Sequence, residues 1–271
     1  MKCLDKKRMI YSFYLDDNSF EHPINKVHFK MLKRYINKFD EVVFCIIIDD
    51  KNRYDLIQRL ETFIVSIYHK NITFKIYENT NYRESLVFYN EIATQMNNLD
   101  GLTFFGHNKG ISDTSSFENT AMWVVSMYYF NLEHELPYDY MNGYYFYGAN
   151  KSAKLTNVWW RDCFIPKNRW FYCGTFFWGK YQSIYEMCEK RGIEIPQLHN
   201  RWYDEHFPGN IVEYDEANSY KEFYIIDAVV LGENIKWYLS ETYRGCESIY
   251  NDFIMFFNEI INDENIDMCN L

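Results

Sequence analysis

The sequence is poor in the two residues that most often interrupt regular structure. Among 271 residues it has 11 glycines and 5 prolines, which excludes collagen-like chains and chains dominated by flexible linkers. Long apolar segments are missing as well. The two longest, 42–48 and 121–130, are far shorter than the ~20 residues needed to cross a bilayer. We therefore expect no transmembrane segment, and contact with a membrane surface stays open.

Regularly spaced cysteines and an excess of basic residues are also lacking. The 7 cysteines form no C-x-x-C motif, which favours reduced thiols over a disulfide framework or a zinc site. The first residues contain no apolar stretch of the kind found in signal peptides, so we predict a cytoplasmic protein. The net charge of −10 disfavours nucleic acid as a partner, because phosphate backbones are bound by basic faces.

Several common catalytic motifs do not occur. No G-x-G-x-x-G follows the first predicted strand, which disfavours a dinucleotide-binding fold. The chain also has no P-loop lysine motif, no G-x-S-x-G elbow and no H-E-x-x-H pair. An active site would therefore be assembled from several separate segments.

What the sequence has instead is a high apolar and aromatic content. Apolar residues make up 48%, enough for the core of one domain of this length, and we expect a single domain over residues 1–271. Aromatic residues make up 20%. Their rings can stack on the apolar faces of sugars or bases, although core packing is the simpler explanation for any single ring.

The first half alternates predicted strands and helices. Strands are expected at 9–14, 42–48, 72–77 and 102–106, and helices at 27–39, 54–68 and 84–96. This order predicts an α/β fold with a mostly parallel central sheet flanked by helices. Ligands of such sheets lie at the carboxyl ends of the strands, so 14–18, 78–84 and 107–113 are candidate site segments.

The second half is less regular. We predict helices at 117–132, 181–191 and 248–261, and strands at 144–147, 170–178 and 224–231. Ser115 or Ser116 should cap the first of these helices, and Gly192 should end the second.

The first chemically suggestive segment, 81–84, reads Asn-Tyr-Arg-Glu at a predicted strand-to-helix junction. The planar guanidinium of Arg83 matches phosphate oxygens, and the Glu84 carboxylate can accept hydrogen bonds from hydroxyl groups of a sugar or ribose. The alternative is an ordinary helix start, since a carboxylate in the first turn is favourable without any ligand.

The second segment, 107–112, follows the last predicted strand of the first half. Lys109 is a compact cation beside Gly110 and suits a departing pyrophosphate. His107 can donate a hydrogen bond to a phosphate or a hydroxyl group. A surface loop with two exposed polar residues explains the same pattern equally well.

The third segment combines aromatic rings with a later pair of carboxylates. Gly174 allows a ligand to approach the backbone closely, and Trp178 offers a ring for stacking. Beyond a predicted helix, Asp204 and Glu205 are adjacent, and one of them can take a proton from an acceptor hydroxyl group. The alternative is a core strand followed by a surface acidic pair.

The ordered set of these segments resembles a group of bacterial and viral glycosyltransferases that includes the rhamnan-synthesis F type. In that group the pieces read approximately N-x-G-R-D/E, H-T/S-K-G, S-G-N-F-W-W and R-Y-x-x-E. Here they are Asn-Tyr-Arg-Glu (81–84), His-Asn-Lys-Gly (107–110), Cys-Gly-Thr-Phe-Phe-Trp (173–178) and Arg-Trp-Tyr-Asp-Glu (201–205). The resemblance covers roughly residues 9–210. It implies a GT-A-like fold and transfer of a sugar from a nucleotide donor to a glycan or lipid-linked glycan in polysaccharide or glycoconjugate biosynthesis.

The resemblance also implies a role for each segment. The nucleotide-sugar half would be about 1–115 and the acceptor half about 116–271. The nucleotide sugar would be bound by Tyr14, Asp16, Asp17, Arg83, Glu84, His107 and Lys109. The sugar or acceptor would be bound by Gly174, Thr175 and Trp178. Glu205, or otherwise Asp204, would be the general base of an inverting displacement, with Lys109 assisting the leaving group.

This chain departs from the group at several positions. Tyr82 replaces a glycine, Asn108 replaces a small hydroxyl residue and Thr175 replaces an asparagine. The sequence also has no D-x-D, the motif through which most GT-A enzymes hold a divalent metal. We therefore predict metal-independent transfer without a cofactor, although the Asp pairs 16–17 and 49–50 leave a manganese or magnesium site open.

Two other functions remain as alternatives. One is a nucleotidyltransferase that makes the sugar donor, which usually has a glycine-rich basic loop after the first strand; this chain has none. The other is a non-catalytic glycan-binding module on the same fold, with aromatic residues but no working donor site.

Overall fold

The computed structural model of the chain describes residues 6–108, 116–133, 141, 143–152, 171–172, 175–198, 203–222 and 247–263, without the side chains of 149–152, 171, 205 and 219–222. The first half contains β1 (Lys7–Leu15), α1 (Pro23–Tyr35), η1 (Ile36–Lys38), β2 (Glu41–Ile48), α2 (Tyr54–Ile67), β3 (Asn71–Glu78), α3 (Glu84–Phe88), η2 (Tyr89–Ala93), η3 (Met96–Asn98) and β4 (Leu102–His107). The second half contains α4 (Phe117–Tyr128), η4 (Tyr129–Glu133), β5 (Phe146–Ser152), β6 (Phe171–Tyr172), β7 (Phe177–Gly179), α6 (Tyr181–Arg191), α7 (Tyr203–Ile211), η5 (Tyr214–Glu216), β8 (Ala217–Glu222) and α9 (Glu247–Asn262).

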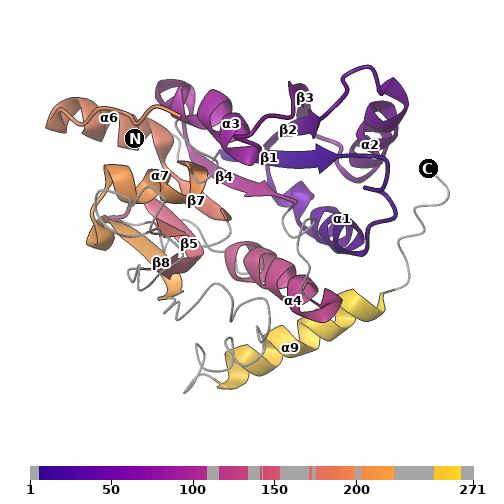
Figure 1. Cartoon of the computed structure of the whole chain (residues 1–271). Coiled ribbons are helices and arrows are strands. Elements are labelled where there is room, and N and C mark those ends of the chain that lie inside the picture. Colours follow the sequence, from indigo (N-terminus) through magenta and orange to yellow (C-terminus); the bar gives the residue numbers. More distant parts are fainter. Residues whose placement is uncertain are drawn as a thin grey trace.

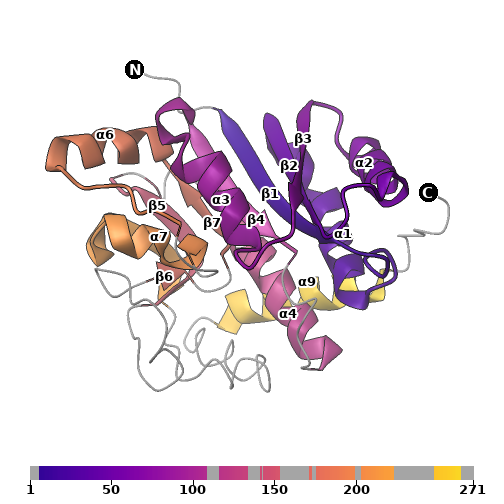
Figure 2. The same ribbon diagram turned by 45° about the horizontal axis from the view of Figure 1, so that its top comes forward.

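The described strands form one sheet in the order β3-β2-β1-β4-β7-β5-β6, with β8 paired to β5. The strands of the first half are all parallel: β1 pairs with β2 and β4, and β2 pairs with β3. Figure 2 shows them side by side. In the second half, β7 is antiparallel to β4 and to β5, and β6 is antiparallel to β5. The predicted α/β class with a mostly parallel sheet between helices is therefore confirmed.

Helices cover both faces of this sheet (Figure 1). On one face, Tyr11 and Phe13 of β1 pack with apolar residues of α1, α2, α4 and α9. On the other face, Ile10 packs with residues of α3, α6 and α7. Successive side chains of a strand point to opposite faces, so a strand covered on both faces is apolar along its whole length. Among the described helices, none is long and apolar enough to span a membrane.

Several element ends follow from local chemistry. The Ser116 hydroxyl accepts from the backbone N–H of Asn119 and caps α4, which makes Ser116 the cap of the two predicted serines. Helix α6 ends at Gly192, whose φ of 64° is the left-handed conformation that favours glycine at this position. Both boundaries were predictable because they depend on neighbouring residues alone.

The second half differs from the prediction at one predicted strand and at two elements that were not predicted. The segment 170–178 is not one strand, because β6 and β7 pair with different parts of β5. Between them Thr175 has a φ of 59°, which an extended strand cannot contain. Two elements, α7 and β8, were not predicted at all, and the predicted strand at 224–231 lies outside the described residues.

Helix α3 also differs in detail from the helix predicted at 84–96. It is α-helical over Glu84–Phe88 and continues as the π-helical turn η2 over Tyr89–Ala93. The backbone N–H of Thr94 donates to the carbonyl of Tyr89, 3.0 Å away. A π turn is wider than an α turn and occurs often at functional sites. The position of η2 becomes important below.

Candidate functional site at the carboxyl ends of the parallel strands

The polar residues proposed from the sequence lie where the parallel strands end. Register pairs such as Leu15 with Ile48, and Ile48 with Glu78, bring the ends of β1, β2 and β3 to one edge of the sheet. His107 is the last residue of β4, the other neighbour of β1. The chain passes from β1 to β2 on one side and returns to β4 on the other. This reversal between β1 and β4 is where open α/β sheets bind ligands.

Asn108 holds the end of β1 in place. Its amide oxygen accepts from the Tyr14 backbone N–H at 2.7 Å, and its amide nitrogen donates to the Tyr14 carbonyl at 2.9 Å. The same nitrogen donates to Asn25 Oδ1 at 3.2 Å. A hydroxyl group at position 108 has a single hydrogen, so it could not donate both of these hydrogen bonds. In the sequence Asn108 stood out only as a departure from the motifs that the chain resembles, and its positioning role was missed.

Tyr14 connects the end of β1 to the end of β2. Its hydroxyl donates to Asp49 at 2.9 Å, and the other Asp49 oxygen accepts from the Asn79 amide at 2.7 Å. Partial burial, together with the Asp49 and Asp16 carboxylates, raises the pKa of Tyr14 to about 12, against an opposing effect of Arg83. The phenol therefore stays protonated at neutral pH and acts as a fixed donor at this edge.

Arg83 occupies a backbone conformation that normally requires glycine. Its φ is 48° and its ψ is −129°, and the Ser85 N–H donates to the Tyr82 carbonyl at 3.0 Å. These values describe a type II′ turn with Arg83 at its second position, where glycine is strongly preferred. An arginine there costs about 1–3 kcal/mol in backbone strain. In the motif that this segment resembles, a glycine precedes the arginine, whereas here the unusual conformation is that of Arg83 itself.

Glu84, His107 and Asp204 come from three separate sequence segments that approach one another through two contacts. His107 Nδ1 is 4.0 Å from Glu84 Oε1, with side-chain exposures of 8% and 26%. Next to Glu84, the Ser85 hydroxyl donates to Asp204 at the start of α7. Asp204 is 1% exposed. Because it is buried, Asp204 is poorly placed to act as a base on an acceptor hydroxyl group. Its hydrogen bond with Ser85 instead attaches α7 to α3.

The two predicted carboxylates after β1 have local partners. Asp16 accepts from the Asn18 N–H at 3.0 Å and from the Ser19 hydroxyl at 2.8 Å, so it shapes the turn that follows the strand. Asp17 forms a surface ion pair with Arg53. Asp16 and Asp17 therefore both have structural roles at the rim of the site.

Trp178 and Thr175 are not where the sequence analysis expected them. The Trp178 ring is 3% exposed and packs between Phe39 and Phe104, with ring centroids 5.5 and 5.2 Å away. Its indole N–H donates to the Asn131 carbonyl at 3.1 Å. Thr175 is 1% exposed. The expectation that Trp178 is a stacking wall for a sugar is therefore wrong: strand alternation turns this ring into the core.

Three other proposed residues cannot be located. Lys109 and Gly174 lie outside the described residues, and so does the side chain of Glu205, although its backbone belongs to α7. In the described part of the chain, no group of three or more His, Cys, Asp or Glu side chains is arranged to hold a metal ion. Comparison with known proteins identifies no relative, since no protein-family model and no curated protein matches this chain.

Proposed function

We propose that this protein is a glycosyltransferase of GT-A-like fold, which moves a sugar from a nucleotide donor to a glycan acceptor. One observation carries the proposal: Glu84 and His107, which belong to two separate sequence segments, lie close together at the carboxyl edge of the parallel strands, and Ser85, next to Glu84, contacts Asp204 of a third segment. Helix capping or loop structure acts within one segment and does not explain why separate segments meet at the edge where such sheets bind ligands.

The donor side of the proposed site is the edge formed by β1, β2 and β3. Because the Tyr14 proton goes to Asp49, this pair offers acceptor oxygens to the N–H groups of a base or the hydroxyl groups of a ribose. The exposed Arg83 suits the diphosphate, because a guanidinium binds phosphate oxygens in a bidentate manner. The strain on its backbone is a further argument for a ligand-binding role, since such outliers collect at functional sites.

The proposed chemistry is a displacement at the anomeric carbon of the sugar. The acceptor oxygen forms a bond to this carbon while the bond to the diphosphate breaks and leaves its electron pair on the phosphate oxygen. Glu205 is assigned to take the proton of the acceptor hydroxyl group. Lys109 and Arg83 are assigned to the negative charge that develops on the departing diphosphate. Asp204 is assigned a positioning role, because its hydrogen bond with Ser85 attaches the start of α7 to α3.

Nucleotide binding is the first test of this proposal. UDP, GDP or dTDP should bind with a free energy of about −4 to −8 kcal/mol, a millimolar to micromolar affinity, in isothermal titration calorimetry with the full chain. Arg83→Ala should weaken this binding, whereas Lys33→Met, an exposed lysine on α1, should not. Absence of heat with all three nucleotides would contradict the proposal.

Kinetics separate the two assigned catalytic residues. With a sugar nucleotide that the chain turns over, Lys109→Met should lower kcat by about 10²–10³ and weaken diphosphate binding. Glu205→Gln should lower kcat by about 10²–10⁴ and leave donor binding nearly unchanged, because its partner is the acceptor. Normal turnover of Glu205→Gln would exclude Glu205 as the base.

Metal dependence gives a third test. Since the sequence has no D-x-D, we predict that turnover survives a chelator such as EDTA. Loss of turnover with EDTA and its recovery with manganese or magnesium would instead assign the carboxylates of Asp16 or Asp49 to a metal, as both stand at the ends of parallel strands.

A further inference from the structure

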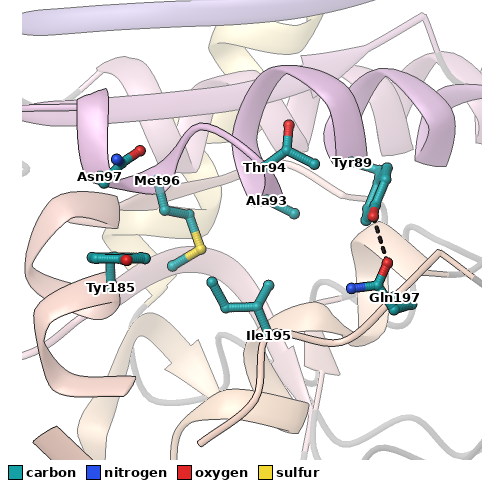
Figure 3. Close-up of a pocket in the computed structure, with 8 residues that line it drawn as sticks. All are labelled: Tyr89, Ala93, Thr94, Met96, Asn97, Tyr185, Ile195 and Gln197. Atoms are coloured by element: carbon teal, nitrogen blue, oxygen red, sulfur yellow. Dashed lines mark hydrogen bonds between the residues drawn. The ribbon is translucent and has the colours of Figure 1, made fainter. Parts of the chain in front are cut away.

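A separate cavity of about 190 Å³ lies at the far end of the helix that begins in the candidate site. Figure 3 shows it between η2, η3, α6 and the chain around Ile195. Tyr185 and Asn97 stand at one end, and Tyr89 and Gln197 at the other. From Glu84 to this region the helix rises roughly 10 Å. The cavity is thus close to the candidate site without belonging to it.

The cavity lining is neutral and half polar. The polar side chains are Tyr89, Thr94, Asn97, Tyr185 and Gln197. The others are Ala93, Met96 and Ile195. Among the residues that the structure describes, no Lys, Arg, Asp or Glu lines the cavity, so an ionised ligand such as a phosphate or carboxylate would lose its hydration without gaining a partner from this lining. A neutral ligand rich in hydroxyl groups, with one apolar face for a tyrosine ring, matches this lining.

The wide π turn and two tyrosines give the cavity its shape. Both Tyr89 and Ala93 belong to η2, and Tyr89 donates to Gln197 at 2.6 Å. The Tyr89 ring meets Tyr203 edge to face at 5.8 Å, and the Tyr203 hydroxyl donates to the Pro196 carbonyl. Tyr203 is the neighbour of Asp204 in α7. The helix formed by α3 and η2 therefore reaches both the candidate site and the cavity, and α7 packs against the lining residue Tyr89.

We infer that this cavity binds one neutral sugar ring of the acceptor glycan, away from the ring that reacts. This inference rests on the proposed glycosyltransferase function for the identity of its ligand. A volume near 190 Å³ equals about six times the ~30 Å³ that a water molecule occupies in the liquid, which suits a single ring rather than a whole oligosaccharide. Exposed Asn97 and Gln197 can exchange bound water for sugar hydroxyl groups.

Met96 provides a direct reporter, because its side chain lines the cavity (Figure 3). The full chain is labelled with ¹³C-methyl methionine, and the Met96 signal is assigned with Met96→Leu. The methyl glycosides of glucose, galactose, N-acetylglucosamine and rhamnose are then titrated to about 50 mM, well above a millimolar Kd. At least one should shift the Met96 signal, while the signal of Met255, 71% exposed on α9, stays in place.

Two matched tyrosine variants complete the experiment. Tyr185→Ala should weaken the glycoside response about tenfold, whereas Tyr54→Ala, which removes a 70% exposed tyrosine from α2, should leave it unchanged. No Met96 shift with any glycoside, or a shift that Tyr185→Ala leaves unaltered, would overturn the inference. Nucleotide titration of the same sample tells the two proposals apart: a glycoside response without nucleotide binding contradicts only the glycosyltransferase, and nucleotide binding without a glycoside response contradicts only the cavity site.

Discussion

The two ends of the helix formed by α3 and η2 present different chemistry to a ligand. At the first end, charged side chains gather around a strained arginine: Arg83 has a φ of 48°, and Glu84 lies 4.0 Å from His107. At the second end, neutral side chains surround a cavity beside a π turn. The guanidinium of Arg83 at the first end matches phosphate oxygens, whereas the neutral hydroxyl and amide groups at the second end match the hydroxyl groups of a sugar.

This contrast assigns the aromatic residues of the chain to two roles. Trp178 lies in the core and is nearly inaccessible, while Tyr89 and Tyr185 are half-buried at the cavity. Trp178, the ring that the sequence predicted to stack on a sugar, is thus a packing residue. The rings that could contact a glycan are Tyr89 and Tyr185, which belong to none of the four motifs. The following predictions test the contrast through the free energy of unfolding and through ligand binding, in order of decreasing effect on stability.

The largest effect is expected for Trp178→Ala. Removing this buried ring should lower the free energy of unfolding by about 3–5 kcal/mol, measured by urea denaturation. Trp178→Phe keeps much of the packing and should cost less. In the folded Phe variant, nucleotide affinity and the Met96 response to glycosides should both persist. A Phe variant of normal stability that no longer binds glycosides would instead return Trp178 to the ligand site.

Asn108→Ala should affect only the charged end. It removes the two hydrogen bonds to the Tyr14 peptide groups, and a buried group left without a partner costs about 1–3 kcal/mol. Nucleotide binding should weaken because the end of β1 is no longer held, whereas the Met96 response to glycosides should stay. Asn98→Ala, an exposed asparagine in η3 near the cavity, is the control and should change neither stability nor nucleotide affinity.

Arg83→Gly and Arg83→Ala should change stability in opposite directions. Glycine accepts the positive φ of this turn, so Arg83→Gly should raise the free energy of unfolding by about 1 kcal/mol. Alanine keeps the strain, so Arg83→Ala should not stabilise the protein. Both variants lose the guanidinium and should weaken nucleotide binding equally. If Arg83→Gly is less stable than the parent, contacts of the arginine side chain stabilise this turn by more than the backbone strain costs.

The smallest effect is expected for Asp204→Asn. The amide oxygen of asparagine can still accept from the Ser85 hydroxyl, so the free energy of unfolding should change by less than about 1 kcal/mol. Turnover should fall far less than in Glu205→Gln, because Asp204 acts as a positioning residue. A loss of turnover equal to that of Glu205→Gln, at unchanged stability, would make Asp204 the base.

Much of the first half was predictable because its signals are local. The continuous apolar run at 42–48 and the helical spacing at 54–68 led to β2 and α2 within a residue or two of their observed ends. Ser116 begins α4 and Gly192 ends α6 as predicted, since capping depends on the nearest few peptide groups. In the second half, the residues 170–178 have the composition of a strand throughout. The neighbouring residues did not predict the φ of 59° at Thr175, which separates β6 from β7.

By itself, the sequence determined the α/β class, the parallel direction of the strands of its first half and the strand ends at which polar residues would meet. These follow from periodicity and from the geometry that parallel strands impose on their ends. Only the tertiary structure decided that Trp178 points into the core, that Arg83 has the glycine-like conformation, and that Asn108 holds the Tyr14 peptide groups. It alone also formed the neutral cavity, because Tyr89, Tyr185 and Gln197 are brought together by packing between helices far apart in the chain.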